Sequence, residues 1–110
     1  MVAWLFGLKN VPPAALHDRL GAVVVVDVNS IHSWTAAHVP QARRLAPLNF
    51  TAADLPAERT TPLVFYCSNW LCSKAPNAAR RARQMGFSDV AVMSAGIAGW
   101  QAAGLPTASG

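Results

Sequence analysis

Two cysteines five positions apart, Cys67 and Cys72, are the residues in this sequence best suited to chemistry. The first directly follows an apolar run, residues 63–66, that is typical of a buried strand. The second directly precedes residues 73–85, where the spacing of the alanines predicts a helix. No histidine adjoins Cys67 in sequence to act as a base. We therefore predict that Cys67 is a nucleophile activated by the loop and helix that follow it.

The change from strand to helix at Cys67 has features that make a thiol reactive. It leaves several backbone N–H groups without helical partners and adds the positive end of the helix dipole. Lys74, on the first helical turn, adds a positive charge. Such surroundings lower a thiol pKa from about 8.5 to roughly 3.5–7.5, so we expect Cys67 to be largely ionised at neutral pH. The alternative is that Cys67 is a small buried hydrophobic residue at a strand end.

Cys72 has four interpretations. The alternatives are a packing residue, a resolving thiol that forms a disulfide with Cys67, an acceptor of sulfur from Cys67, and half of a metal site. The metal site is disfavoured, because zinc needs four ligands and His17, His32 and His38 are far upstream without ligand spacing. We therefore expect no metal, and structural or surface roles for the three histidines.

Strand and helix patterns alternate along the chain. The expected strands are residues 2–5 at an edge, 22–26, 43–48, 63–66 and 90–93. The expected helices are residues 14–20, 29–38 with Ser30 as cap, 51–55 with Thr51 as cap, 73–85 and 96–103. This order predicts one α/β domain over residues 1–110, with a small, mostly parallel central sheet flanked by helices on both faces. Ligands bind at the carboxyl ends of strands in such sheets, and Cys67 stands at one.

The composition argues against several classes of protein. With 110 residues, 53% of them hydrophobic, the chain fits one domain with a real core. The net charge of +4 includes a basic run from Lys74 to Arg83, but no aromatic residues alternate with these charges, so we expect no nucleic-acid partner. The apolar start, residues 1–8, is too short for a membrane span and lacks a signal-peptide pattern. We therefore expect no membrane partner and a cytoplasmic location.

Several segments match those of one known family in both order and spacing. They are Val23 to Val28, Trp34, Ala37-His38-Val39-Pro40-Gln41-Ala42, Phe65-Tyr66-Cys67, Gly86-Phe87-Ser88-Asp89-Val90 and Ala95 to Pro106 with its Gly96, Gly99, Trp100 and Gly104. From Val11 to Pro106 the chain resembles the single-domain rhodaneses, which are sulfurtransferases.

This resemblance implies a cycle in which Cys67 takes a sulfane sulfur from a donor such as thiosulfate and holds it as a persulfide. The persulfide then passes the sulfur to cyanide, a small thiol or a protein thiol, and no cofactor is needed. The resemblance also implies an anion-binding loop after Cys67, formed by Ser68, Asn69, Trp70, Leu71, Cys72, Ser73 and Lys74. Asp27 is interpreted as a structural residue that orients loops near the site.

The chain departs from the family pattern at three positions. Trp70 and Cys72 stand where the family often has glycine and arginine, and Asn29 stands where arginine is common. Loss of arginine disfavours efficient use of thiosulfate, whereas Trp70 either walls the pocket for a flatter, more apolar substrate or covers the core. The sixth position after Cys67 is Ser73, not the arginine with which phosphatases of this fold grip phosphate, so phosphatase activity is not predicted.

Three functions compete at this level. The first is a rhodanese-type sulfurtransferase that works through a Cys67 persulfide. The second is a dithiol redox or sulfur-relay protein that uses Cys67 and Cys72. The third is a non-catalytic interaction module that keeps the fold.

Overall fold

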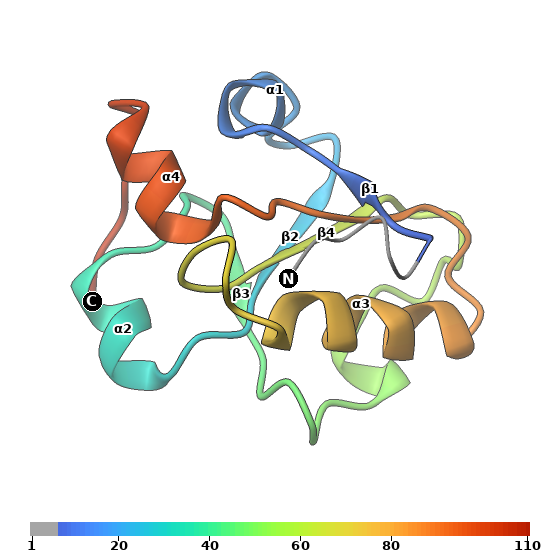
Figure 1. Cartoon of the computed structure of the whole chain (residues 1–110). Coiled ribbons are helices and arrows are strands. Elements are labelled where there is room, and N and C mark those ends of the chain that lie inside the picture. The colour runs from blue at the N-terminus through green and yellow to red at the C-terminus, as the bar shows by residue number, and fades with distance from the viewer. Residues whose placement is uncertain (1–6) are drawn as a thin grey trace.

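Five parallel strands form the centre of the molecule. The computed structural model describes residues 7–110. The strands are β1 (Lys9–Asn10), β2 (Val24–Asp27), β3 (Arg43–Arg44), β4 (Leu63–Tyr66) and β5 (Val90–Val92). They form one sheet in the order β1-β5-β4-β2-β3, with every neighbouring pair parallel (Figure 1). The predicted parallel α/β sheet is confirmed, and β4 is its central strand.

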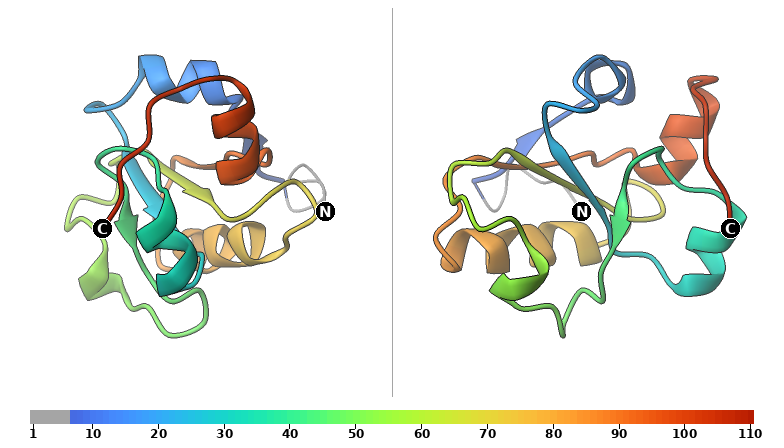
Figure 2. Two further views of the ribbon diagram at one scale, coloured as in Figure 1. Left: turned by 90° about the vertical axis from the view of Figure 1, so that its left-hand side faces the viewer. Right: turned by 180° about the vertical axis from the view of Figure 1, so that it is seen from behind.

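Helices cover both faces of this sheet, as predicted. The helices are α1 (Pro13–Asp18), α2 (Ile31–Ala36), the 3₁₀ helix η2 (Ala52–Asp54), α3 (Lys74–Gln84) and α4 (Gly96–Ala102). Figures 1 and 2 show α3 along one face, with α1 and α4 together on the other. None of the helices within residues 7–110 is long and apolar enough to cross a lipid bilayer.

The central strand β4 is held between two apolar cores. Successive strand residues point to opposite faces, so Leu63 and Phe65 join the core under α3, and Val64 and Tyr66 join the core under α1 and α4. All four side chains are buried. On α3, the buried alanines let the helix approach the sheet closely; they are Ala75, Ala78, Ala79 and Ala82. Packing on both faces therefore fixes where β4 ends, and with it the position of Cys67.

Most predicted elements are present, with small shifts at their ends. β4 has the predicted bounds, and β2 and β5 each overlap their predicted ranges. Ser30 caps α2 as predicted, with its hydroxyl accepting the Ser33 N–H at 3.2 Å. Thr51 is the residue at the start of η2, where its N–H donates to the Asp54 carboxylate at 2.8 Å.

Two strands differ from expectation. β3 ends at Arg44 because the chain turns at Ala46, whose carbonyl accepts N–H groups from Asn49 and Phe50. β1 was not predicted, because its two polar residues carry no apolar pattern; it lies at the sheet edge beside β5. The strand expected over residues 2–5 lies outside the described residues.

Candidate active site

The carboxyl ends of three neighbouring strands meet at Cys67. β2 ends at Asp27, which pairs in register with Tyr66, the last residue of β4. On the other side Phe65 pairs with Val92, the last residue of β5. Cys67 follows Tyr66 directly and only 2% of it is exposed. The predicted position at the carboxyl edge of the sheet is therefore the one observed.

The chain from Cys67 to Asn69 is anchored on the start of α4. The Cys67 carbonyl accepts the Ile97 N–H at 2.9 Å, and the Ser68 carbonyl accepts the Ala98 N–H at 3.0 Å. These carbonyls satisfy N–H groups that the first helical turn leaves without partners. Gly96 lies against the same backbone with φ +66°, and a Cβ there would be 2.6 Å from both the Cys67 carbonyl oxygen and the Asn69 nitrogen. Only glycine fits this approach without a shift of the loop.

The two cysteines are joined by a disulfide across the loop. Their Cα atoms are 6.4 Å apart, inside the range of about 4.4–6.8 Å that disulfides require. Asn69 draws the loop together, because its side-chain oxygen accepts the Leu71 N–H at 2.9 Å and its carbonyl accepts the Cys72 N–H at 3.1 Å. Two of the predicted anion-binding amides are thus engaged inside the loop.

The remaining residues of the predicted loop have distinct environments. The Ser68 hydroxyl donates to the Asn29 side-chain oxygen at 2.9 Å. Ser73 precedes the first residue of α3, Lys74, which is exposed. Trp70 and Leu71 are also exposed, at 61% and 66%. The loop therefore combines a buried sulfur with an outward apolar rim.

A shallow surface hollow lies beside the two sulfurs. Its lining comes from the loop, the first turn of α3 and the end of β5: Cys67, Asn69, Trp70, Cys72, Ala75, Pro76, Val92, Met93 and Ser94. Ser94 is held in place by Asn10, whose side-chain oxygen accepts the Ser94 N–H at 2.8 Å. A small molecule entering this hollow would meet the cysteine loop on one side and strand β5 on the other.

Asp27 is fully buried at the end of β2. One of its carboxylate oxygens accepts the Asn29 N–H at 2.7 Å, and the other lies buried without a hydrogen-bond partner among the described residues. Burial raises the pKa of Asp27, and interactions with the Tyr66 hydroxyl and the Asn29 N–H oppose the rise. Burial, followed by the Asp27 charge, also raises the pKa of Tyr66. Hydrogen bonds through Asn29 join Asp27 to Ser68 in the loop, which suits a positioning role.

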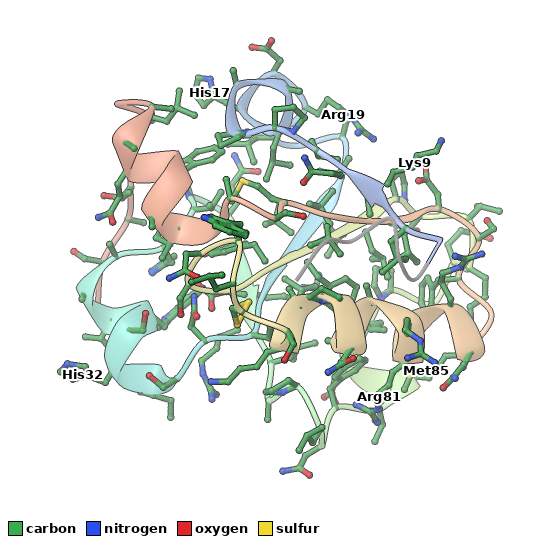
Figure 3. The ribbon with its side chains drawn as sticks, viewed as in Figure 1. Lys9, His17, Arg19, His32, Arg81 and Met85 are labelled. Carbon is green, nitrogen blue, oxygen red and sulfur yellow. A yellow bond between two sulfur atoms is a disulfide. The ribbon has the colours of Figure 1, made fainter. Side chains whose placement is uncertain are left out.

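The histidines lie on separate elements. His17 belongs to α1 and His32 to α2, well apart in Figure 3. The His17 ring meets the edge of Trp100, with ring centres 5.8 Å apart. His38 stacks on Trp34, and its Nδ1 lies 2.8 Å from the Trp34 carbonyl oxygen. Over residues 7–110, no three His, Cys, Asp or Glu side chains are grouped to hold a metal ion.

Sequence reasoning missed three residues that shape the site. The sequence marks Asn29 only as a replacement for arginine, whereas in the structure it links Asp27 to the loop. Ser94 lines the hollow. It follows β5, the neighbour of β4, and a polar residue at the carboxyl end of a neighbouring strand is a sequence signal for a residue at the site. Gly96 belongs to a segment that matches the family, but its contact with Cys67 depends on how α4 packs against the loop.

Comparison with known proteins identifies the family. A model described as "Rhodanese-like domain" matches residues 12–103. The chain belongs to the rhodanese-like family. It is 36% identical over 92 residues to an HTH-type transcriptional regulator, Rv0324 of Mycobacterium tuberculosis, a match that covers 82% of this chain and 39% of the regulator. It is 30% identical over 81 residues to the thiosulfate sulfurtransferase GlpE of Pseudoalteromonas translucida, covering 74% of this chain and 75% of that protein.

Solved structures show the same fold. The BH2092 protein of Bacillus halodurans superposes with a TM-score of 0.83 at 21% identity, over 92% of this chain and 77% of that one. At this identity the likeness concerns the fold alone. Together with GlpE, the family match supports sulfurtransferase chemistry for the rhodanese-like domain at the level of its family.

The contact between Gly96 and the loop can be tested against a matched glycine. Gly96→Ala should lower the free energy of unfolding by about 1–3 kcal/mol more than Gly104→Ala, because of overpacking against backbone. Gly104 has a similar φ of +73°, but a Cβ there meets nothing within 4 Å, so it reports backbone strain alone. Urea denaturation measures both values. Equal losses in the two variants would contradict the close approach at Gly96.

The raised pKa of Asp27 predicts a pH-dependent stability difference from Asp27→Asn. The folded protein holds the Asp27 proton more tightly than the unfolded chain, so the favourable contribution is complete below the ordinary value of 3.8 and is lost as pH rises through the raised pKa. The stability of wild type relative to Asp27→Asn should therefore increase as pH falls from 7 toward 4. Denaturant titrations across this range measure it, with exposed Asp18→Asn as control for a lost charge. An opposite slope would refute the assignment.

Proposed function

We propose that this protein is a sulfurtransferase that carries a sulfane sulfur as a persulfide on Cys67. The observation that carries the proposal is the place of Cys67, at the carboxyl end of the central strand of a rhodanese-like domain and beside a hollow. The donor is a small sulfur compound such as thiosulfate. The acceptor is cyanide or a thiol, either small or on a protein.

The proposed reaction has two displacement steps. In the first, the Cys67 thiolate attacks the sulfane sulfur of the donor, forming an S–S bond while the donor's own bond to that sulfur breaks and its electron pair leaves with, for example, sulfite. In the second, the acceptor attacks the outer sulfur of the persulfide and restores the thiolate. No external oxidant or reductant is needed. The start of α3 favours both anionic forms of Cys67, because its dipole and Lys74 place positive potential near the loop.

Replacement of Cys67, the proposed sulfur carrier, gives the direct test of this function. Reduced wild-type protein should form thiocyanate from cyanide and at least one sulfane donor, and Cys67→Ser should lose at least about 10³-fold in kcat/KM because its hydroxyl is a weak nucleophile at neutral pH. Cys72→Ser should keep measurable turnover in the same colorimetric assay, which controls for loss of a thiol in the loop. Thiocyanate formation by well-folded Cys67→Ser at the wild-type rate would exclude the assignment.

A second function, a dithiol sulfur relay, is favoured by the disulfide between Cys67 and Cys72. After loading, the Cys72 thiolate attacks the inner sulfur of the persulfide, the Cys67 Sγ. A Cys67–Cys72 bond forms, the bond to the sulfane sulfur breaks, and hydrosulfide leaves. The sulfane sulfur is reduced and the two cysteines are oxidised, so the step balances without an added oxidant. A thiol or dithiol reductant then restores the pair.

The relay predicts one released sulfide per protein. Wild-type protein is first reduced and freed of excess reductant, and is then treated with a donor. It should release close to one equivalent of hydrosulfide per protein molecule and form the Cys67–Cys72 disulfide. Cys72→Ser should release none and retain the added sulfur, since it lacks the attacking thiol. A sulfide electrode and intact mass measure the two outcomes. Equal persulfide lifetimes in wild type and Cys72→Ser would argue against a resolving role for Cys72.

A further inference from the structure

The hollow beside Cys67 contains no charged side chain. Its polar groups, apart from the two sulfur-bearing residues, are Asn69 and Ser94, which are both neutral. Its other lining residues are apolar, and all of them except Trp70 are buried: Trp70, Ala75, Pro76, Val92 and Met93. A dianion such as thiosulfate would leave water for a site with no side chain of opposite charge on its walls, which is unfavourable.

Backbone amides offset this deficit only in part. The Leu71 and Cys72 N–H groups donate to Asn69, and the Ile97 and Ala98 N–H groups donate to Cys67 and Ser68 carbonyls. The first turn of α3 contains Pro76, which has no N–H to offer. The amides left to bind an anion are fewer than the length of the loop suggests.

Two arginines, Arg44 and Arg81, use their guanidinium groups to bind backbone carbonyls. Arg44 donates to the Asn29 carbonyl at 2.9 Å, and Arg81 donates to the Pro47 and Phe50 carbonyls at 3.0 and 2.8 Å. Figure 3 shows Arg81 on the outer side of α3. Lys74 is exposed and is not part of the lining. No side chain that lines the hollow can therefore pair with the second charge of a dianion.

From this lining we infer that the preferred sulfur donor is an organic persulfide with an uncharged apolar substituent, rather than thiosulfate. The inference rests on the proposed persulfide chemistry of Cys67. The substituent packs against the exposed Trp70 indole at the rim of the hollow, and the sulfane sulfur faces Cys67. Aromatic substituents should bind most favourably, because they can stack on the flat face of the Trp70 indole.

The transfer from such a donor balances without another reagent. The Cys67 thiolate attacks the terminal sulfur of R–S–SH and forms the Cys67 persulfide. The bond between the terminal sulfur and the R–S sulfur breaks, and its electron pair leaves as the thiolate R–S⁻. The terminal proton stays on the transferred sulfur. The thiol product is apolar and carries at most one charge, so it suits the same hollow.

The test compares three donors on reduced protein: benzyl persulfide, methyl persulfide and thiosulfate. A Cys72→Ser background keeps the product persulfide from being resolved, and Cys67→Ser in the same background gives the uncatalysed rate. The rate at which the protein gains one sulfur is followed by intact mass on acid-quenched samples. We expect the second-order rate constant to be highest for benzyl persulfide and at least about tenfold lower for thiosulfate.

Substitutions at Trp70 test whether its side chain causes the preference for an aromatic persulfide donor. Trp70→Ala should lower the rate constant for benzyl persulfide by about fivefold and change those for methyl persulfide and thiosulfate by less than about twofold, because only the aromatic contact is lost. Trp70→Phe should recover most of the loss. Leu48→Ala, on an exposed apolar side chain outside the hollow, should leave all three rates unchanged.

The outcomes separate this inference from the proposed function. Loading by thiosulfate as fast as by benzyl persulfide, or equal losses for all donors in Trp70→Ala, would overturn the donor preference and leave the Cys67 sulfurtransferase standing. Failure of all three donors to load Cys67 would overturn the sulfurtransferase itself and the preference with it.

Discussion

The contact between Gly96 and the backbone of residues 67–69 is the constraint on which the site depends. The loop after β4 crosses the start of α4 so closely that a Cβ at Gly96 would lie 2.6 Å from loop backbone atoms. At this crossing the Cys67 and Ser68 carbonyls accept the N–H groups of Ile97 and Ala98. One contact therefore caps α4 and sets the direction in which the chain leaves Cys67.

The two helices near Cys67, α3 and α4, have different roles in this arrangement. The first N–H groups of α4 are used for structure, so its dipole end faces backbone carbonyls rather than a ligand. The start of α3 follows the loop and carries Lys74, so it is the element that would stabilise an anionic sulfur in the proposed reaction. Lys74 lies close to the cysteine loop in the chain, and no charged side chain is among the residues that line the hollow. Phosphate binding relies on multiple charged contacts, which the residues that line the hollow do not supply.

The buried polar residues on the β2 side extend the same support. Asp27 accepts the Asn29 N–H, and Asn29 accepts the Ser68 hydroxyl, so the end of one strand is tied to the loop that follows its neighbour. The carboxylate is costly to bury, as the raised pKa of Asp27 indicates. Its hydrogen bond to Asn29, which in turn binds the Ser68 hydroxyl, supports a positioning role.

Much of the fold could be predicted from the sequence, because strand and helix signals are local. The run that became β4 has the predicted bounds, and the alanine spacing of α3 was correctly assigned to a helix. β1 could not be predicted, since two polar residues become a strand only by pairing with β5. At the site, Cys67 was identified from its strand and loop, whereas Asn29, Ser94 and the role of Gly96 depend on contacts between distant segments. Such contacts leave no periodic pattern in one sequence.

The central claim is that Cys67 carries a sulfane sulfur, and the mass of the protein after donor treatment tests it most directly. Reduced Cys72→Ser protein, incubated with a sulfane donor, should gain the mass of one sulfur atom, and peptide mapping should locate it on Cys67. Cyanide should then remove that mass. A protein that gains no sulfur from any donor, or that gains it equally when Cys67 is replaced by serine, would contradict the account.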